Sequence, residues 1–255
     1  MANCVSPLTL ENQDPKILNA FRTVPCGKCK HCRDNRRNAW SFRLFHEWKH
    51  SASAIWCTFT YAPEHMPYDY SKDYRNKEER EMLKLEPWEQ DHTCEMATYG
   101  MLDIDDMQKF LKRLRKRKQT LKKKLLDTNH RSWKEPIRYF NVGEYGTKGD
   151  RPHWHTFLFN VPAQMQDIEI SRIWGKGHVH IDDVTPKDIH YTTGYMMEEN
   201  NMATMSRRPG IGARYLDEKM TRWHAKGNDY VMYNGIKLPI PEYYIQIMLR
   251  RSEEH

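Results

Sequence analysis

The stretch "RPHWHTFLFN", residues 151–160, decides the fold, because it follows a second strand-like segment, "IRYFNVGEY", residues 137–145. Both segments are rich in β-branched and aromatic residues, and the "GTKGD" between them has the composition of a turn. The pattern predicts a β-hairpin whose strands are residues 137–145 and 153–160. Residues two apart in a strand point to the same face, so we expect His153 and His155 to lie together.

The predicted hairpin also brings a carboxylate to the two histidines. With a turn at residues 146–150, Glu144 lies opposite His153, and opposed residues have Cβ atoms about 5 Å apart. Glu144, His153 and His155 then form a three-ligand metal site with coordination positions left open for a substrate. Histidines that are simply part of a strand are the alternative interpretation.

A second histidine pair lies further along the chain, His178 and His180 in "GKGHVHIDDV". No obvious hairpin partner precedes it. We therefore expect this pair to belong to a structural strand or loop and predict the metal site at the first pair.

Further strands and helices surround the hairpin. Residues 54–63, "AIWCTFTYAP", are β-branched and aromatic and end at a proline, which predicts a strand. Residues 103–118 have apolar side chains at helical spacing, with Asp103 or Asp105 as N-cap. Residues 185–199 begin with a capping-box variant, so a helix should start there. These elements predict an α+β fold with a central antiparallel sheet flanked by helices.

The chain divides into three predicted parts. Residues 1–40 are irregular and contain four of the six cysteines, and residues 41–200 form the core of helices and strands. Residues 201–255 hold the Gly/Arg segment "SRRPGIGARY" and a tail packed on the core. The polar residues 66–100 indicate a long loop or a partly helical insertion.

The charge balance points to a polyanionic partner. The chain has 41 Lys and Arg against 34 Asp and Glu, a net charge of +7, and the excess is concentrated in "KFLKRLRKRKQTLKKK", residues 109–124. Nucleic acid is the commonest polyanion that such a surface binds. A solvated helix face is the alternative. The candidate DNA-binding residues of this helix are Lys112, Arg113, Arg115 and Lys116.

The N-terminal sequence has no charged-then-apolar signal pattern. No stretch approaches the ~18 consecutive apolar residues of a membrane span. We therefore expect an intracellular protein that does not engage a membrane, and we expect its cysteines to be reduced.

The N-terminal cysteines have metal-ligand spacing. Cys26, Cys29 and Cys32 form a Cys-x-x-Cys-x-x-Cys run, and Cys4 completes a set of four thiolates, for which His31 is the alternative fourth ligand. Structural zinc prefers four such ligands. An iron–sulfur cluster uses the same donors, and reduced cysteines without a metal are the third alternative.

Tyr191 and Tyr195 lie four residues apart in a predicted helix and therefore share a face. Two phenols beside a metal suit covalent phosphoryl transfer, in which a tyrosine oxygen attacks a DNA phosphorus and holds the 5′ end. A free phenol has a pKa near 10 and needs activation or a polarised target. Two tyrosines that pack the helix onto the core are the alternative.

Taken together and in this order, the motifs resemble those of one family. The chain resembles the replication initiation proteins of microviruses, small phages with circular single-stranded DNA, and the gokushovirus type most of all. Those proteins belong to the HUH endonucleases, named for two His that flank a hydrophobic residue. The resemblance covers most of the chain, in "WCTFTY" (56–61), "GEYGTKGDRPHWHTFLF" (143–159), "YTTGY" (191–195), "PCGKCKHCRDNRRNAW" (25–40) and "SRRPGIGARY" (206–215).

The resemblance implies a role for each motif. His153 and His155 match the metal-binding pair, Trp154 the hydrophobic spacer and Glu144 the third ligand, for Mg²⁺ or Mn²⁺. The paired tyrosines match the nucleophiles of the two-tyrosine branch, and Thr58 and Thr60 fall in a mainly structural strand motif. The implied activity is nicking and rejoining of single-stranded DNA at the origin in rolling-circle replication. The implied setting is the host bacterial cytoplasm, with the host replication machinery as partner.

The chain departs from the family pattern after the second tyrosine, where Glu198 and Glu199 stand in place of the expected lysines. Lys187, one helical turn before Tyr191, is the predicted substitute. Arg207 and Arg208 in the Gly/Arg segment are further candidates for phosphate contacts.

Two other function classes fit part of the pattern. Two His and a Glu can hold catalytic zinc in a hydrolase, but the sequence has no His-Glu-x-x-His helix and such an enzyme needs no tyrosine pair. A non-catalytic, zinc-dependent DNA-binding protein is the other alternative. Replacing Tyr191 and Tyr195 distinguishes the three, because only the nicking enzyme loses covalent capture of DNA.

Overall fold

The computed structural model describes residues 4–11, 21–67, 100–146, 151–197 and 202–253. The predicted insertion at 66–100 and the two glutamates after the second tyrosine therefore lie largely or wholly outside the described residues. None of the helices in the described part of the chain combines the length and apolar character that a bilayer span requires.

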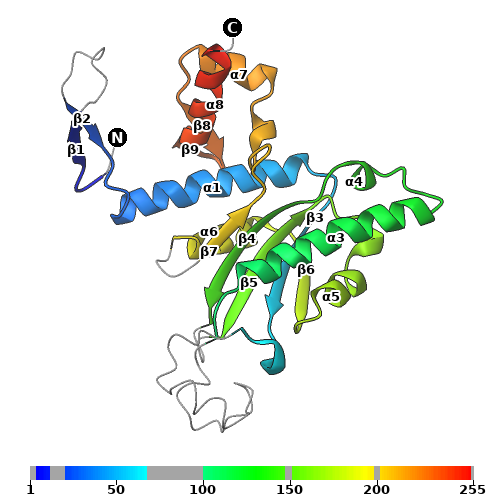
Figure 1. Ribbon diagram of the computed structural model, residues 1–255. Coiled ribbons are helices and arrows are strands. Elements are labelled where there is room, and N and C mark those ends of the chain that lie inside the picture. The colour runs from blue at the N-terminus through cyan, green and yellow to red at the C-terminus, as the bar shows by residue number, and fades with distance from the viewer. Residues whose placement is uncertain (1–3, 12–20, 68–99, 147–150, 198–201, 254–255) are drawn as a thin grey trace, which may run out of the picture.

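A five-stranded antiparallel sheet forms the centre of the molecule, with strand order β6-β3-β5-β4-β7. Helices cover both of its faces, so the predicted α+β architecture is confirmed (Figure 1). The strands are β3 (Ala54–Thr60), β4 (Arg138–Tyr145), β5 (Pro152–Phe159), β6 (Val179–Asp183) and β7 (Met202–Met205).

The hairpin predicted from residues 137–160 is confirmed as β4 and β5. Its register pairs Glu144 with His153 and Tyr145 with Pro152. Beyond the last pair, the Gly146 N–H donates to the Arg151 carbonyl at 3.0 Å. The five-residue turn therefore fixes the register that brings the carboxylate to the histidines.

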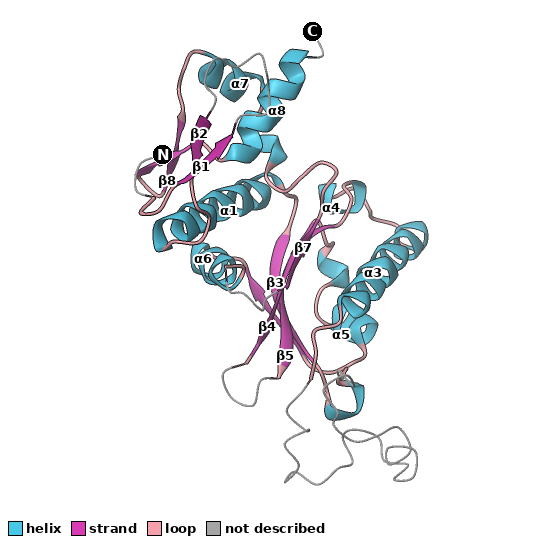
Figure 2. Cartoon of the chain, turned by 60° about the vertical axis from the view of Figure 1, so that its left-hand side comes forward, coloured by secondary structure: helices cyan, strands magenta, loops and turns pink. Residues whose placement is uncertain are grey.

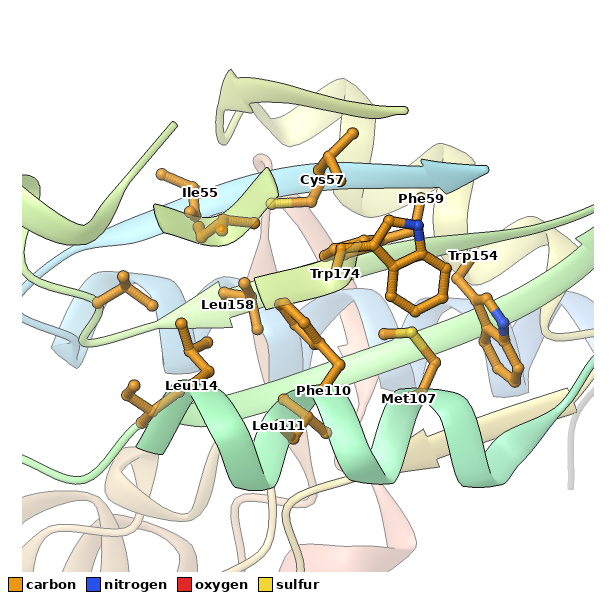
Figure 3. Packing of buried hydrophobic residues seen from close by; sticks show 14 of the residues in the cluster. Ile55, Cys57, Phe59, Met107, Phe110, Leu111, Leu114, Trp154, Leu158 and Trp174 are labelled. Atoms are coloured by element: carbon orange, nitrogen blue, oxygen red, sulfur yellow. The ribbon is translucent and has the colours of Figure 1, made fainter. Parts of the chain in front are cut away.

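One face of the sheet packs against α3 (Ile104–Lys124), the helix expected from residues 103–118. Asp103 is its N-cap and accepts a hydrogen bond from the Asp105 N–H. Its apolar positions are buried against side chains of β3 and β5 and against Trp174 of α5 (Ile168–Trp174) (Figure 3). The α3 residues in this contact are Met107, Phe110, Leu111 and Leu114, all at most 2% exposed.

The other face packs against α1 (Lys30–His50) and α6 (Pro186–Tyr195) (Figure 2). The predicted capping box of α6 is confirmed, because Thr185 and Asp188 cap each other. A buried hydrogen bond of 2.8 Å between Ser41 Oγ and Thr193 Oγ1 joins α1 to α6. The two helices therefore form one layer over the sheet.

A C-terminal lobe lies on the side of α1 away from the sheet (Figures 1 and 2). It packs its own apolar cluster around Phe42 of α1. The lobe contains α7 (Glu218–Ala225), β8 (Tyr230–Tyr233), β9 (Ile236–Pro239) and α8 (Glu242–Glu253). The remaining elements are β1 (Leu8–Glu11), β2 (Phe21–Val24), α4 (Arg131–Lys134), η1 (Pro63–His65), η4 (Ala163–Met165) and η5 (Ala213–Tyr215).

The Gly/Arg segment holds α1 and the sheet together. Glu47 of α1 forms a buried ion pair with Arg138 of β4 and accepts a hydrogen bond of 2.8 Å from the Gly212 N–H. Arg138 also donates to the carbonyls of Pro209 and Gly210. Gly212 has φ +76°, and a Cβ there would lie 2.5 Å from the Arg43 carbonyl oxygen, so only glycine fits. The segment is therefore a structural clasp around α1.

The predicted part boundaries lie close to these elements. Residue 40 falls inside α1, and β7, just beyond residue 200, pairs with β4 in the main sheet. The division into residues 1–40, 41–200 and 201–255 remains a prediction about organisation.

Candidate active site

Glu144, His153 and His155 meet on the sheet face that α1 and α6 cover. Oε1 of Glu144 lies 2.6 Å from Nε2 of His153 and 3.1 Å from Nε2 of His155. Trp154, between the histidines, points to the opposite face and is fully buried in the α3 core. Strand alternation thus makes the spacer a core residue and leaves both imidazoles on one side.

The donor set of this cluster suits a divalent ion. The ligand atoms of the three residues all lie within 4.8 Å of one another. Among the described residues, Oε2 of Glu144 is buried and has no hydrogen-bond partner. A buried carboxylate oxygen without a partner is costly, and coordination of a cation would satisfy it. Carboxylate and imidazole together suit Mg²⁺ and Mn²⁺, with the imidazoles favouring Mn²⁺.

The electrostatics of the cluster depend on the histidine protons. Burial raises the pKa of Glu144, but its hydrogen bonds with His153 and His155 outweigh burial and leave that pKa below its usual value. Burial lowers the pKa of His153, but the hydrogen bonds to Glu144 and to the Arg151 carbonyl leave that pKa above its usual value. Without a metal, a proton on His153 therefore takes the place of the cation.

Metal affinity should consequently depend on pH. The raised pKa of His153 means that its charged form stabilises the metal-free protein below the unfolded pKa, and this stabilisation is lost as pH rises through the folded pKa. A metal needs the neutral imidazole, so Mn²⁺ affinity should rise about tenfold per pH unit until His153 is deprotonated, because one proton is displaced per ion. Titration calorimetry across pH 5–8 measures this slope. A flat profile would contradict a site that uses His153.

Two residues of β3 hold His155, and the sequence analysis gave neither a role at the site. The Trp56 ring stacks on the His155 ring with centroids 5.2 Å apart and an interplanar angle of 7°. Thr58, opposite His155 in the register, places its Oγ1 3.1 Å from Nδ1 of His155. This contact orients the ring so that Nε2 faces the carboxylate. Strand alternation in "WCTFT" was the available signal, but the pairing of β3 with β5 had to be known.

Helix α6 carries the two tyrosines directly above the histidines. The His155 ring centroid lies 5.5 Å from that of Tyr191 and 5.9 Å from that of Tyr195. The Tyr195 hydroxyl donates to the Tyr191 hydroxyl at 2.9 Å. Tyr191 is 45% exposed, and the Trp56 indole N–H donates to Thr192 at 3.2 Å, which ties α6 to the same strand. The structure therefore brings the predicted nucleophiles and the predicted metal ligands together.

The second histidine pair lies apart from this cluster. His180 is on β6, an edge strand paired with β3, and forms an exposed ion pair of 2.8 Å with Asp182. The His178 carbonyl accepts the Thr60 N–H at 2.9 Å. Neither residue joins a metal-ligand group among the described residues. The expectation of a structural strand at this pair agrees with β6.

The family model for the replication-associated protein ORF2 matches residues 54–200. The chain belongs to this family of replication-associated proteins. The match includes the hairpin, β3, α3 and α6, and thus every residue of the cluster and both tyrosines. It confirms the resemblance to microvirus replication initiation proteins.

Three curated phage proteins are similar to this family member. Replication-associated protein VP4 of Bdellovibrio phage phiMH2K is 26% identical, over 90% of this chain and 68% of the relative. Replication-associated protein ORF2 of Spiroplasma virus 4 is also 26% identical, over 91% and 69%. Replication-associated protein ORF4 of Chlamydia phage 1 is 24% identical, over 71% and 48%. No solved structure matches the chain.

The N-terminal cysteines of the family member also converge. The sulfur atoms of Cys4, Cys26, Cys29 and Cys32 lie within 4.8 Å of one another. The Cys26 N–H donates to Cys4 Sγ and the Cys29 N–H to Cys26 Sγ, both at 3.3 Å. Backbone hydrogen bonds at Val5 and Cys32 lower the pKa of Cys29 to about 6. The four sulfurs thus fit a tetrahedral metal, and exposed His31 is not part of the group.

We expect purified protein to contain about one tightly bound zinc ion, because four converging thiolates form a closed structural site. Cys29→Ala should lose the zinc, whereas Cys57→Ala, a matched cysteine buried in the core, should keep it. Elemental analysis gives the stoichiometry, and hydrogen exchange should show residues 1–40 opening first after chelation. A folded protein without zinc or iron would rule this site out.

The predicted DNA-binding residues lie on separate surfaces. Lys112, Arg113, Arg115 and Lys116 are exposed on α3, which covers the sheet face opposite the cluster (Figure 2). Lys187 is exposed on α6, one turn before Tyr191. Arg207 and Arg208 are exposed at the start of the clasp. The structure therefore places only Lys187 on the same helix as the tyrosines.

Neutralising the four basic residues of α3 should weaken binding to all DNA sequences alike. Each lost phosphate contact should reduce the slope of log affinity against log salt by about 0.7–0.9. Fluorescence anisotropy with Lys112, Arg113, Arg115 and Lys116 changed to Gln measures this slope. An unchanged slope would mean that the basic run of α3 is only a solvated face.

Proposed function

We propose that the protein is a two-tyrosine HUH endonuclease that nicks and rejoins single-stranded DNA at a phage replication origin through a covalent 5′-phosphotyrosine intermediate. The observation that carries the proposal is the position of Tyr191 and Tyr195, whose rings contact His155 of the Glu144/His153/His155 cluster. A plain helix-packing role would not require a tyrosine pair above three converging metal ligands.

Glu144, His153 and His155 would hold Mg²⁺ or Mn²⁺. A bound divalent ion supplies Lewis-acid polarisation of a phosphate oxygen. Trp56 and Thr58 keep His155 in the orientation that presents Nε2 to the site. The same Trp56 contacts Tyr191 edge to face, with centroids 6.2 Å apart, so one side chain positions both a ligand and a nucleophile.

In the nicking step, a tyrosine Oη attacks the scissile phosphorus. The bond between phosphorus and the 3′ oxygen breaks, the phenol proton passes to solvent, and the released 3′ oxygen takes up a proton. The 3′ hydroxyl becomes a primer that the host replication machinery extends in the bacterial cytoplasm. The second tyrosine, with its hydroxyl 2.9 Å from the first, attacks the regenerated junction in turn. Rejoining is the reverse of the nicking step at the tyrosine–phosphorus bond.

The remaining candidate residues support this chemistry as proposals. Lys187 would contact the DNA backbone near the tyrosines, and Arg207, Arg208 and the basic residues of α3 would contact phosphates further away. The cysteine cluster would hold a structural zinc that orders the N-terminal part of the chain. The core at residues 41–200 would then be the catalytic part.

Incubating the protein with circular single-stranded phage DNA and Mn²⁺ tests the proposal. We expect a protein–DNA adduct that resists denaturation, together with a linear strand that has a free 3′ hydroxyl. The hydrolase alternative predicts no adduct, and a non-catalytic binding protein predicts retention of intact circles.

A further inference from the structure

We propose that the C-terminal lobe and α1 form a second binding surface for single-stranded DNA, separate from the nicking site. This surface uses no part of the hairpin or of the tyrosine pair, so it goes beyond the proposed function. It consists of two hollows, which we call the lobe groove, and its character is an alternation of aromatic rings and cations.

The larger hollow has a volume of about 1030 Å³ and lies between α1 and the β8–β9 hairpin. Its wall contains a stack in which the Arg43 guanidinium lies between two rings, 3.9 Å from the Trp40 centroid and 3.7 Å from the Tyr243 centroid. Lys237 lies over Tyr230, with Nζ 3.7 Å from the ring centroid. Exposed Arg36 lines the same hollow.

The smaller hollow has a volume of about 530 Å³ and lies along α7. Three cations and Trp223 line it, and the cations are Lys219, Arg222 and Lys226. The Trp223 and Tyr230 rings, one from each hollow, pack edge to face with centroids 5.0 Å apart. This aromatic contact connects the two hollows.

The charges of the lobe groove favour a polyanion. Six Lys and Arg residues line the two hollows against two carboxylates, those of Asp229 and Glu242. Cations interleaved with aromatic rings are the arrangement that binds a single strand, because phosphates pair with the cations while unpaired bases stack on the rings. A duplex keeps its bases stacked inside and cannot use the rings. Membership of a replication-associated family makes DNA the single strand to expect.

Helix α1 separates the lobe groove from the tyrosines. Arg36, Trp40 and Arg43 recur at helical spacing on its groove side. On its α6 side, Arg37 donates to the His190 carbonyl at 2.9 Å and Ser41 bonds to Thr193. A strand that leaves α6 therefore has to cross one helix diameter, about 10 Å, to reach the lobe groove. We infer that this surface holds DNA flanking the cleaved position.

Binding measured without chemistry tests this proposal. Tyr191→Phe/Tyr195→Phe protein, with no added Mg²⁺ or Mn²⁺, is titrated into a fluorescent oligo(dT), so failure of the nicking proposal leaves the result interpretable. Arg36→Ala combined with Lys237→Ala should weaken binding about tenfold, the effect of losing phosphate contacts and an ordered base. Lys134→Ala combined with Arg172→Ala, the same charge change on exposed residues outside the groove, should change affinity less than twofold.

Photocrosslinking guards against a variant that folds poorly. Oligo(dT) carrying 5-iododeoxyuridine should crosslink to Trp223, Tyr230 or Tyr243 of the protein with its native groove, as mapped by mass spectrometry. A duplex of the same length should compete poorly. Equal affinity of the two double variants, crosslinks confined to other regions, equal competition by duplex, or a preference for oligo(rU) would each overturn the proposal.

Discussion

Replacing both Tyr191 and Tyr195 with Phe should abolish covalent capture of DNA while leaving the fold intact. Phe keeps each ring, so the contacts of both residues with His155 survive and only the attacking oxygens are lost. Metal binding should therefore be unchanged. Denaturing electrophoresis of the reaction with single-stranded circular DNA and Mn²⁺ measures the adduct, and calorimetry measures the metal.

The single substitutions should differ from each other. Tyr191 is 45% exposed and its oxygen accepts the hydrogen bond from Tyr195, whereas Tyr195 stacks on His155. We expect Tyr191→Phe to lose more activity, with at least one single variant still able to nick. Tyr145→Phe is the matched control, because Tyr145 is next to Glu144 in β4 but packs into the α3 core. An adduct mapped to Tyr139 or Tyr145 would overturn the assignment of the nucleophiles.

Changing His153 and His155 to Ala should have an effect of similar size by a different route. Without both imidazoles the cluster retains one carboxylate, which cannot hold Mg²⁺ or Mn²⁺ tightly. Loss of Lewis-acid stabilisation removes several kcal/mol from the transition state, so nicking should fall by about 10²–10⁴-fold. His178→Ala combined with His180→Ala is the matched control, since it removes two histidines of the same spacing from the edge strand β6.

Metal titration separates the outcomes of that experiment. The His153/His155 variant should bind no Mn²⁺ at this site and keep its secondary structure by circular dichroism. The His178/His180 variant should bind Mn²⁺ as the unmodified protein does. If the second variant is the one that loses the metal, the cluster on β4 and β5 is not the catalytic site.

Local patterns predicted the parts of the site that local interactions build. The five-residue turn between Glu144 and His153 set the register of the hairpin, and the Thr185–Asp188 box set the start of the tyrosine helix. Both depend on residues close together in the sequence, so hydrophobic period and capping chemistry were sufficient.

The parts that escaped prediction depend on contacts between distant segments. Trp56 stacks on His155 only because β3 pairs with β5, a partner almost 100 residues away. Arg37 reaches the His190 carbonyl across 153 residues of sequence. The "RDNRR" run gave no sign that its helix would lie between the tyrosines and a C-terminal lobe. Such pairings follow from the packing of whole elements, which no short pattern specifies.

Because α1 is one unbroken helix, its partners are locked in rotational phase. Cys32 at its start, Arg37 and Ser41 toward α6, Trp40 and Arg43 toward the lobe, and Glu47 in the clasp all depend on one helical count. Each residue of an α-helix adds about 100° of rotation. A single-residue insertion between Cys32 and Arg37 would swing the cysteine ligand out of line with every later contact. Side chains along this rod can therefore be exchanged one at a time, but its length between the cysteines and the clasp cannot change.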